Sequence, residues 1–126
     1  MRVCEFSVQY GHIHLVVEAA DKRALSRGMQ GLEVRLAREV NRRFARRGQV
    51  FEDRYHARPL RTPTEVKNTV HYVRYNMQKH SADLGLPTDD WALDPFSSVS
   101  GAACWYDGEH RTIARPLTWL LKNAPS

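Results

Sequence analysis

Hydrophobic and polar positions alternate over the first eighteen residues, and this pattern predicts two short strands. Residues 3–9 alternate loosely and end at Tyr10-Gly11, a pair typical of a tight turn. Residues 11–18 follow as a second β-type run, Gly-His-Ile-His-Leu-Val-Val-Glu. The two runs together predict a β-hairpin at the start of the chain.

The second of these strands carries two histidines on one face. Because successive side chains of a strand point to opposite faces, His12 and His14 would share one face, and Ile13, Leu15 and Val17 the other. We expect the apolar face to form the core and the histidine face to form a site. Two imidazoles about 7 Å apart along a strand can bind one divalent ion. The alternative is a pair of surface or hydrogen-bonded histidines, because the pattern is short.

A spacing of three and four residues predicts two helices farther along the chain. Asp21 is a candidate N-cap for a helix of about 25 residues that ends near Gly48. Thr62-Pro63-Thr64-Glu65 combines a cap, a proline at the first helical position and a glutamate three residues after the cap, which predicts a second helix start. The apolar stripes are Leu25, Met29, Leu32, Leu36, Val40 and Phe44 in the first helix and Val66, Val70, Val73 and Met77 in the second.

The remaining segments are less regular. Residues 50–61 alternate from Tyr55 onward, so we expect a strand there, and Pro59 places it at a sheet edge or ends it. Residues 81–126 form a loop-rich tail, in which residues 114–122 are a candidate short helix. The expected packing anchors of the tail are Trp91, Phe96, Trp105 and Tyr106. We therefore expect a single domain over 1–126, with its core at about 3–80.

Composition and charge narrow the class of protein. The chain has 126 residues, 42% hydrophobic and 26% charged, which is typical of one globular domain. It has neither an apolar run of about 18 residues nor a signal peptide, so we expect a cytoplasmic protein without membrane contact. Cys4 and Cys104 lack metal-motif spacing, and we expect two unpaired thiols. The formal charge of +5 favours a polyanionic partner.

Arginine dominates the polar side of the first predicted helix. Its planar fork suits phosphate recognition, although such a face can also be simply solvated, and cations near a helix C-terminus are favoured on structural grounds alone. In the second helix, Tyr72 and Asn76 are four residues apart and share a face beside the apolar stripe. A tyrosine in this place is either a residue at the edge of the core or a functional group.

These features together resemble the single-tyrosine HUH transposases, and most closely the REP-associated tyrosine transposases. The resemblance covers about residues 3–106. It rests on the His-Ile-His strand, the arginine-rich helix, the segment Phe-Glu-Asp-Arg-Tyr-His-Ala at 51–57 and the run Tyr-Val-Arg-Tyr-Asn at 72–76. It implies an α+β, ferredoxin-like domain, an antiparallel sheet with two long helices, from which this chain lacks the first strand and helix. A homodimer would be one way to complete the sheet.

The resemblance also implies a role for each candidate residue. His12, His14 and Asn76 match the family's ligands for Mg²⁺ or Mn²⁺, and Tyr72 matches the nucleophile, with Tyr75 as its rival. The implied activity is nicking and strand transfer of single-stranded DNA beside hairpins, through a 5′-phosphotyrosine intermediate. The residues expected to contact DNA are Arg35, Arg38, Arg42, Arg43, Arg46, Arg54, Arg58 and Lys79.

Two other functions stay open on the sequence. The chain could be a non-catalytic remnant that binds DNA hairpins, which its short N-terminal part favours. It could also be a metal-dependent nuclease in which water is the nucleophile and the tyrosine is structural. The three differ in whether DNA is cut and whether a covalent adduct forms.

Overall fold

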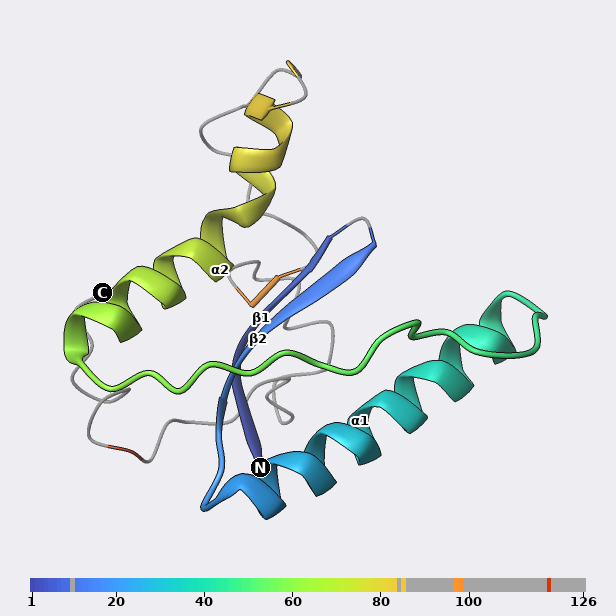
Figure 1. Ribbon diagram of the computed structural model, residues 1–126. Coiled ribbons are helices and arrows are strands. Elements are labelled where there is room, and N and C mark those ends of the chain that lie inside the picture. Colours follow the sequence, from blue (N-terminus) through green and yellow to red (C-terminus); the bar gives the residue numbers. More distant parts are fainter. Residues whose placement is uncertain (10, 84, 86–96, 99–117, 119–126) are drawn as a thin grey trace, which may run out of the picture. The chain divides into compact units, whose positions relative to one another are not determined.

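Two strands and two helices make up the regular structure of the protein. The computed structural model describes residues 1–9, 11–83, 85, 97–98 and 118, with the side chains of 76–82 excepted. In chain order the elements are β1 (Arg2–Gln9), β2 (His12–Glu18), α1 (Lys22–Arg43) and α2 (Pro63–Asp83) (Figure 1). This confirms the predicted α+β class, with an antiparallel strand pair and two long helices. No helix within the described residues is long and apolar enough to cross a membrane.

The chain divides into two compact units, which we describe separately. One unit comprises Met1 and residues 19–59, and it contains α1. The other comprises residues 2–18 and 60–126, and it contains the hairpin and α2. The four tail anchors, Cys104 and most of the predicted helix at 114–122 lie outside the described residues.

The hairpin register places the polar side chains of β1 beside the histidines of β2. Ser7 pairs with His14 and Gln9 pairs with His12 in the antiparallel ladder, and Gly11 in the connection has a φ of 82°. Directly paired residues project from the same face of a sheet. Ser7 and Gln9 therefore share the face of the two histidines.

A bulge in β1 changes which of its side chains are buried. The register shifts between Val3 and Glu5, so Cys4 is the extra residue, and Cys4 and Glu5 are buried in succession. A bulge breaks the strict alternation of a strand and turns the following side chains to the other face. Because the bulge lies before Glu5, it is Val3 whose face changes, and Glu5 shares the face of Ser7 by the normal alternation of the strand.

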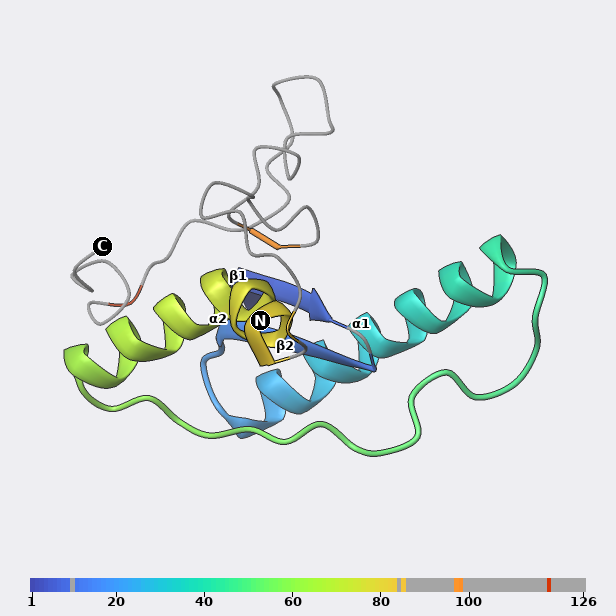
Figure 2. The ribbon, with the colours of Figure 1, turned by 90° about the horizontal axis from the view of Figure 1, so that it is seen from above.

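The core of this unit lies on the histidine face, so the prediction that the apolar face of β2 forms the core was wrong. Val16 and Glu18, which share the face of His14, are buried, whereas the apolar residues of the opposite face are only half-buried. The reason is the position of α2, which packs against both strands and buries Val66 and Val73 (Figures 1 and 2). The histidines thus lie at the edge of a packed interface.

Two short pieces of the C-terminal part of the chain bind to the hairpin. Ser97 bridges to Ser7, and the Ser98 amide donates to the Phe6 carbonyl at 2.9 Å, along the edge of β1 that β2 leaves unpaired. Thr118 donates from its amide and its hydroxyl to Glu18 Oε1, at 2.8 and 2.7 Å. These contacts give hydrogen-bond partners to the Phe6 carbonyl and the Glu18 carboxylate.

The first helix begins as predicted and ends earlier than predicted. Asp21 caps its N-terminus by accepting a hydrogen bond from the Ala24 amide at 2.7 Å. At the other end the Arg46 amide donates to the Asn41 carbonyl, and Ala45 has a φ of 47°, the features of a Schellman motif. The helix therefore ends at Arg43, well before Gly48.

The segment that follows α1 is not a strand, so the prediction of a strand at 50–61 was wrong. Gln49 donates its side-chain amide to the carbonyls of Phe51 and Glu52, at 2.6 and 3.2 Å. Such local side-chain bonds to the backbone compete with ladder formation, and Pro59 has no amide hydrogen to contribute. Most side chains from 52 to 59 are exposed.

The second helix begins with the predicted capping box. The Glu65 amide donates to Thr62 Oγ1 at 3.2 Å, and Glu65 Oε2 accepts from the amides of Thr62 and Arg61. The helix then bends at Tyr75, whose φ of −112° and ψ of 16° are not helical, and Figure 1 shows the change of direction. It continues to Asp83, so residues 81–83 belong to the helix and not to the expected tail.

Candidate active site and nucleic-acid surface

One histidine of β2 and one tyrosine of α2 lie against each other. The ring centroids of His14 and Tyr72 are 5.3 Å apart, and the two rings are nearly perpendicular. The ring of His12 lies next to that of His14, with centroids 4.8 Å apart. The structure therefore brings together three of the four residues expected to act in catalysis and metal binding, from two elements far apart in sequence.

A partly buried ion pair holds α2 against β1 close to this cluster. Arg74 Nη2 lies 2.5 Å from Glu5 Oε1, and the hydroxyl of Ser98 donates to the other oxygen of the same carboxylate. The Glu5 carboxylate raises the pKa of Arg74 above its ordinary value. Because Arg74 is two residues from Tyr72, this pair fixes the rotation of the helix that carries the tyrosine.

Strand β1 adds two polar side chains beside the histidines, on the same face of the hairpin. Ser7 is fully buried opposite His14, and its hydroxyl accepts a hydrogen bond of 2.8 Å from the side-chain amide of Gln9. Sequence reasoning missed Ser7, Gln9, Glu5 and Arg74. The alternation in β1 could have indicated Glu5, Ser7 and Gln9, which share one face, whereas no local signal connects Glu5 with Arg74.

The paired histidines fit a divalent metal ion as part of its ligand set. Two imidazoles bound to one ion at a right angle, with metal–nitrogen bonds of about 2.1 Å, would have centroids roughly 4.6 Å apart, close to the spacing of His12 and His14. Within the part of the chain that the structure describes, no group of three or more His, Cys, Asp or Glu gathers to hold a metal. Among the described residues, a further ligand would thus be of another type, such as a backbone or side-chain oxygen.

Asn76 is the residue expected to supply such an oxygen. Its backbone belongs to α2, and it follows Tyr75, where the helix bends. The bend means that the position of Asn76 relative to Tyr72 is not that of a regular helix four residues on. The side chains of Asn76 and Lys79 lie outside the described residues.

Tyr75, the rival nucleophile, has a different neighbour from Tyr72. Its ring lies against that of His71, with centroids 4.6 Å apart and a tilt of 38°. Tyr75 is 42% exposed, and His71 is also exposed. The ring contact recorded for Tyr75 is therefore with its own helix, whereas that of Tyr72 is with a histidine of the hairpin.

The predicted DNA-contacting arginines are exposed and gather in the unit that contains α1. Residues 19–59 carry all of the chain's net positive charge, because acidic residues slightly outnumber basic ones in the rest of the sequence. Arg42 and Arg43 both bind Glu39, at 2.6 and 2.8 Å, and they lower the pKa of that carboxyl to about 2. The exposed members of the predicted set are Arg35, Arg38, Arg42, Arg43, Arg46, Arg54 and Arg58.

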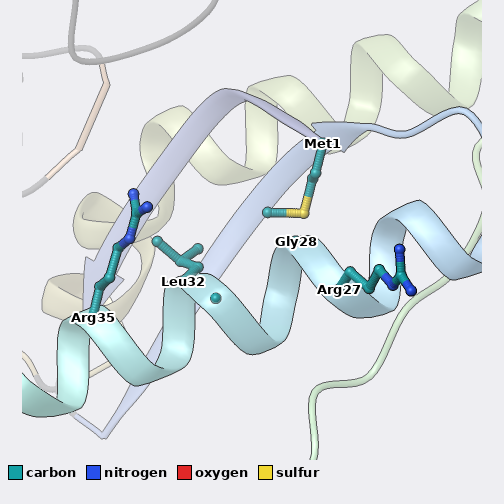
Figure 3. Close-up of a pocket in the computed structure, with 6 residues that line it drawn as sticks. Met1, Arg27, Gly28, Leu32 and Arg35 are labelled. Atoms are coloured by element: carbon teal, nitrogen blue, oxygen red, sulfur yellow. The ribbon is translucent and has the colours of Figure 1, made fainter.

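A shallow hollow of about 360 Å³ lies on α1. Met1 lies directly over Gly28, where a Cβ atom would come within 2.4 Å of the Met1 Cβ, so any larger residue at this position would displace Met1 (Figure 3). Arg27 and Arg35 are among the residues that line the hollow. Arg35 is the one predicted DNA-contacting residue in the lining.

These observations define a small α+β protein in which a helix places a tyrosine beside paired histidines. The family model described as "Transposase IS200 like" matches residues 1–76, and the chain belongs to this family. The matched region includes His12, His14, Tyr72 and Asn76, and it ends before Lys79. No curated protein and no solved structure gives a significant match.

Proposed function

We propose that this IS200-like transposase cuts and rejoins single-stranded DNA beside hairpins, with Tyr72 as its nucleophile. The observation that carries the proposal is the contact between the rings of Tyr72 and His14, on a face that also holds His12. A tyrosine hydroxyl has an ordinary pKa near 10 and needs activation to attack a phosphate at neutral pH. A tyrosine beside two potential metal ligands meets that requirement.

The proposed cleavage exchanges one phosphate ester for another. The Tyr72 Oη attacks the phosphorus and loses its proton, the bond from phosphorus to the 3′ oxygen breaks, and that oxygen takes up a proton. The products are a 5′-phosphotyrosine linkage and a free 3′-hydroxyl. Attack by the 3′-hydroxyl of another DNA end on this linkage releases Tyr72 and joins the strands, so no nucleotide cofactor is consumed.

The proposed metal ligands are His12, His14 and Asn76. A bound Mg²⁺ or Mn²⁺ would polarise the phosphate and stabilise the charge that develops on it. Imidazole nitrogens suit Mn²⁺ better than Mg²⁺, which prefers oxygen ligands, and we therefore favour Mn²⁺ for this site. The packing of α2 on the hairpin would hold Tyr72 against the histidine pair.

The arginines of residues 19–59 would bind the DNA backbone. Guanidinium groups pair with phosphates through a planar fork, and the exposed arginines of α1 provide several such groups. Phosphate contacts of this kind give affinity without sequence preference. The choice of a hairpin-adjacent site would then depend on contacts to bases.

The test is an adduct assay on the full chain. Purified protein is incubated with Mn²⁺ or Mg²⁺ and 3′-labelled hairpin DNA with single-stranded flanks, then analysed on a denaturing gel. We expect a labelled protein–DNA adduct that disappears in Tyr72→Phe and persists in Tyr75→Phe, the matched control from the same turn. DNA binding should be nearly unchanged in both variants.

Three outcomes would contradict the proposal in different ways. Cleavage without an adduct would make water the nucleophile. An adduct that survives in Tyr72→Phe and vanishes in Tyr75→Phe would assign the nucleophile to Tyr75. Binding without any cleavage would make the chain a hairpin-binding remnant.

A further inference from the structure

Two exposed rings form a small aromatic surface on α2. His71 and Tyr75 are one helical turn apart, their ring centroids are 4.6 Å apart, and the rings are tilted by 38°. Both side chains are exposed, Tyr75 to 42%. Aromatic rings held together at a surface leave one apolar edge or face open to a ligand with a flat ring.

This aromatic pair lies close to the proposed nucleophile. In a helix, Tyr75 follows Tyr72 by about 4.5 Å along the axis and about 60° around it. The local departure from helical geometry at Tyr75 turns its side chain relative to this ideal position. His71 directly precedes Tyr72, so the two rings flank the tyrosine along the sequence.

We propose that His71 and Tyr75 form a stacking platform for an unpaired nucleobase next to the phosphate that Tyr72 attacks. This inference rests on the function proposed above and adds a base contact to it. A nucleotide that flanks the attacked phosphate carries its base within reach of a ring one helical turn from the nucleophile. Stacking on aromatic rings is how proteins commonly hold single-stranded nucleic acid.

Three residues lie between His71 and Tyr75 on α2. Tyr72 is also exposed, to 40%, but it is the proposed nucleophile, and the other two pack toward the hairpin. Arg74 is held by the buried carboxylate of Glu5. Val73 is buried against the hairpin. The side of α2 that bears His71 and Tyr75 is accordingly the one that these packing contacts leave exposed.

The experiment measures binding in the absence of divalent ions, so that no DNA is cut. The probe is a labelled single-stranded oligonucleotide from the hairpin flank, together with a series in which one base at a time is replaced by an abasic site. We expect Tyr75→Leu to weaken binding by about 5- to 100-fold, the range that loss of one stacked base implies. Tyr75→Phe keeps the ring and should stay within about twofold of the wild type, and His71→Ala should weaken binding less than Tyr75→Leu.

The abasic series tests whether one base occupies the platform. Wild-type protein should lose affinity at one abasic position by a factor similar to that of Tyr75→Leu, and Tyr75→Leu should lose nothing further at that position. Equal affinity of wild type and Tyr75→Leu, or an unchanged abasic profile in the variant, would overturn the proposal. Circular dichroism and thermal melting establish that each variant is folded.

Failure of this inference is distinguishable from failure of the proposed function. An adduct that forms at Tyr72 while binding is insensitive to Tyr75→Leu and to abasic sites would leave the function standing and remove the platform. Base-dependent binding that Tyr75→Leu abolishes, without any adduct, would retain the platform and remove the nucleophile.

Discussion

His14 is the residue at which the proposed metal site and the proposed nucleophile meet. Its ring contacts both His12 and Tyr72. We expect His14→Ala to lower the affinity for Mn²⁺ by 10-fold or more and to remove metal-dependent adduct formation, because a lone imidazole is a weak site. Isothermal titration with Mn²⁺ measures the affinity without DNA.

The matched control for this change is His71→Ala, which removes a histidine from α2 outside the proposed ligand set. It should leave Mn²⁺ affinity unchanged. Unchanged Mn²⁺ affinity in His14→Ala would exclude His14 as a ligand.

Cys4, the bulged residue of β1, has a thiol whose reactivity can be measured. Burial, followed by the nearby Glu18 carboxylate, raises the pKa of the Cys4 thiol from 9.0 to about 11. The neutral thiol is therefore favoured in the folded state. Its contribution to stability is complete below pH 9 and is lost as the pH rises from 9 to 11, where the unfolded chain already forms thiolate.

We expect Cys4 to react slowly with iodoacetamide in the folded protein, because the thiolate is the reactive species. In a Cys104→Ser background at pH 8.5, the alkylation rate should be at least 10-fold lower in the native protein than in urea. The rate should increase only as the pH approaches 11. Equal rates in native and unfolded protein would show that Cys4 is neither buried nor shifted in pKa.

Between elements, the contact most sensitive to substitution is that of Glu5 with Arg74. Arg74→Met would leave the buried Glu5 carboxylate with the Ser98 hydroxyl as its hydrogen-bond donor within the described residues. Because the Arg74 side chain is 39% exposed and solvent screens the pair, we expect a loss of about 1–3 kcal/mol in the free energy of unfolding. Urea unfolding followed by circular dichroism measures it. Arg42→Met breaks a pair with Glu39 at the surface, where solvent screens the charges, and should change stability little.

Loss of the ion pair between Glu5 and Arg74 should disturb Tyr72 even in a protein that remains folded. In Glu5→Gln, the ring-current shift that Tyr72 imposes on the His14 imidazole protons should decrease, because the helix loses its fixed rotation. Nuclear magnetic resonance detects this shift, with Tyr72→Leu defining its absence. An unchanged His14 shift in a folded Glu5→Gln variant would show that the ion pair does not position the tyrosine.

Local sequence signals predicted the helices well and the packing less well. The caps at Asp21 and Thr62 are visible in sequence because they depend on residues within one turn. The β1 bulge and the burial of the histidine face were not predictable, since they depend on how α2 packs on the hairpin. The early end of α1 depends on Ala45 in a left-handed conformation, which alanine rarely adopts and which the sequence therefore conceals.

The candidate site was predictable for a related reason. His12 and His14 share a face by the two-residue period of a strand, and Tyr72 was assigned from the resemblance of its helix. The groups that hold these side chains in place, Glu5 and Arg74, come from elements 69 residues apart. No spacing rule connects residues so distant in sequence.

At the scale of the whole molecule, positive charge and the proposed chemistry belong to different units of the chain. The net positive charge lies in residues 19–59, and the histidines and Tyr72 lie in the other unit. Glu39, whose pKa is lowered to about 2, stays ionised at any pH used for DNA binding. The cluster of Arg42, Arg43 and Glu39 therefore contributes one net positive charge and not two.

Arg35 and Arg38 should consequently matter more per residue for DNA binding than Arg42 or Arg43. Both are exposed, and no ion pair is recorded for either within the described part of the chain. Each phosphate contact to single-stranded DNA adds about 0.7 to the slope of log affinity against log salt concentration. We expect the double variant Arg35→Gln and Arg38→Gln to reduce that slope by about 1.4 and to weaken binding most at low salt.

The matched control is Arg61→Gln, which changes an exposed arginine of the other unit and should leave the slope nearly unchanged. Fluorescence anisotropy titrations at salt concentrations from about 50 to 300 mM measure the slope. An equal slope in the double variant and the wild type would mean that the arginine face of α1 is a solvated surface, and that the affinity for DNA comes from the unit that contains Tyr72.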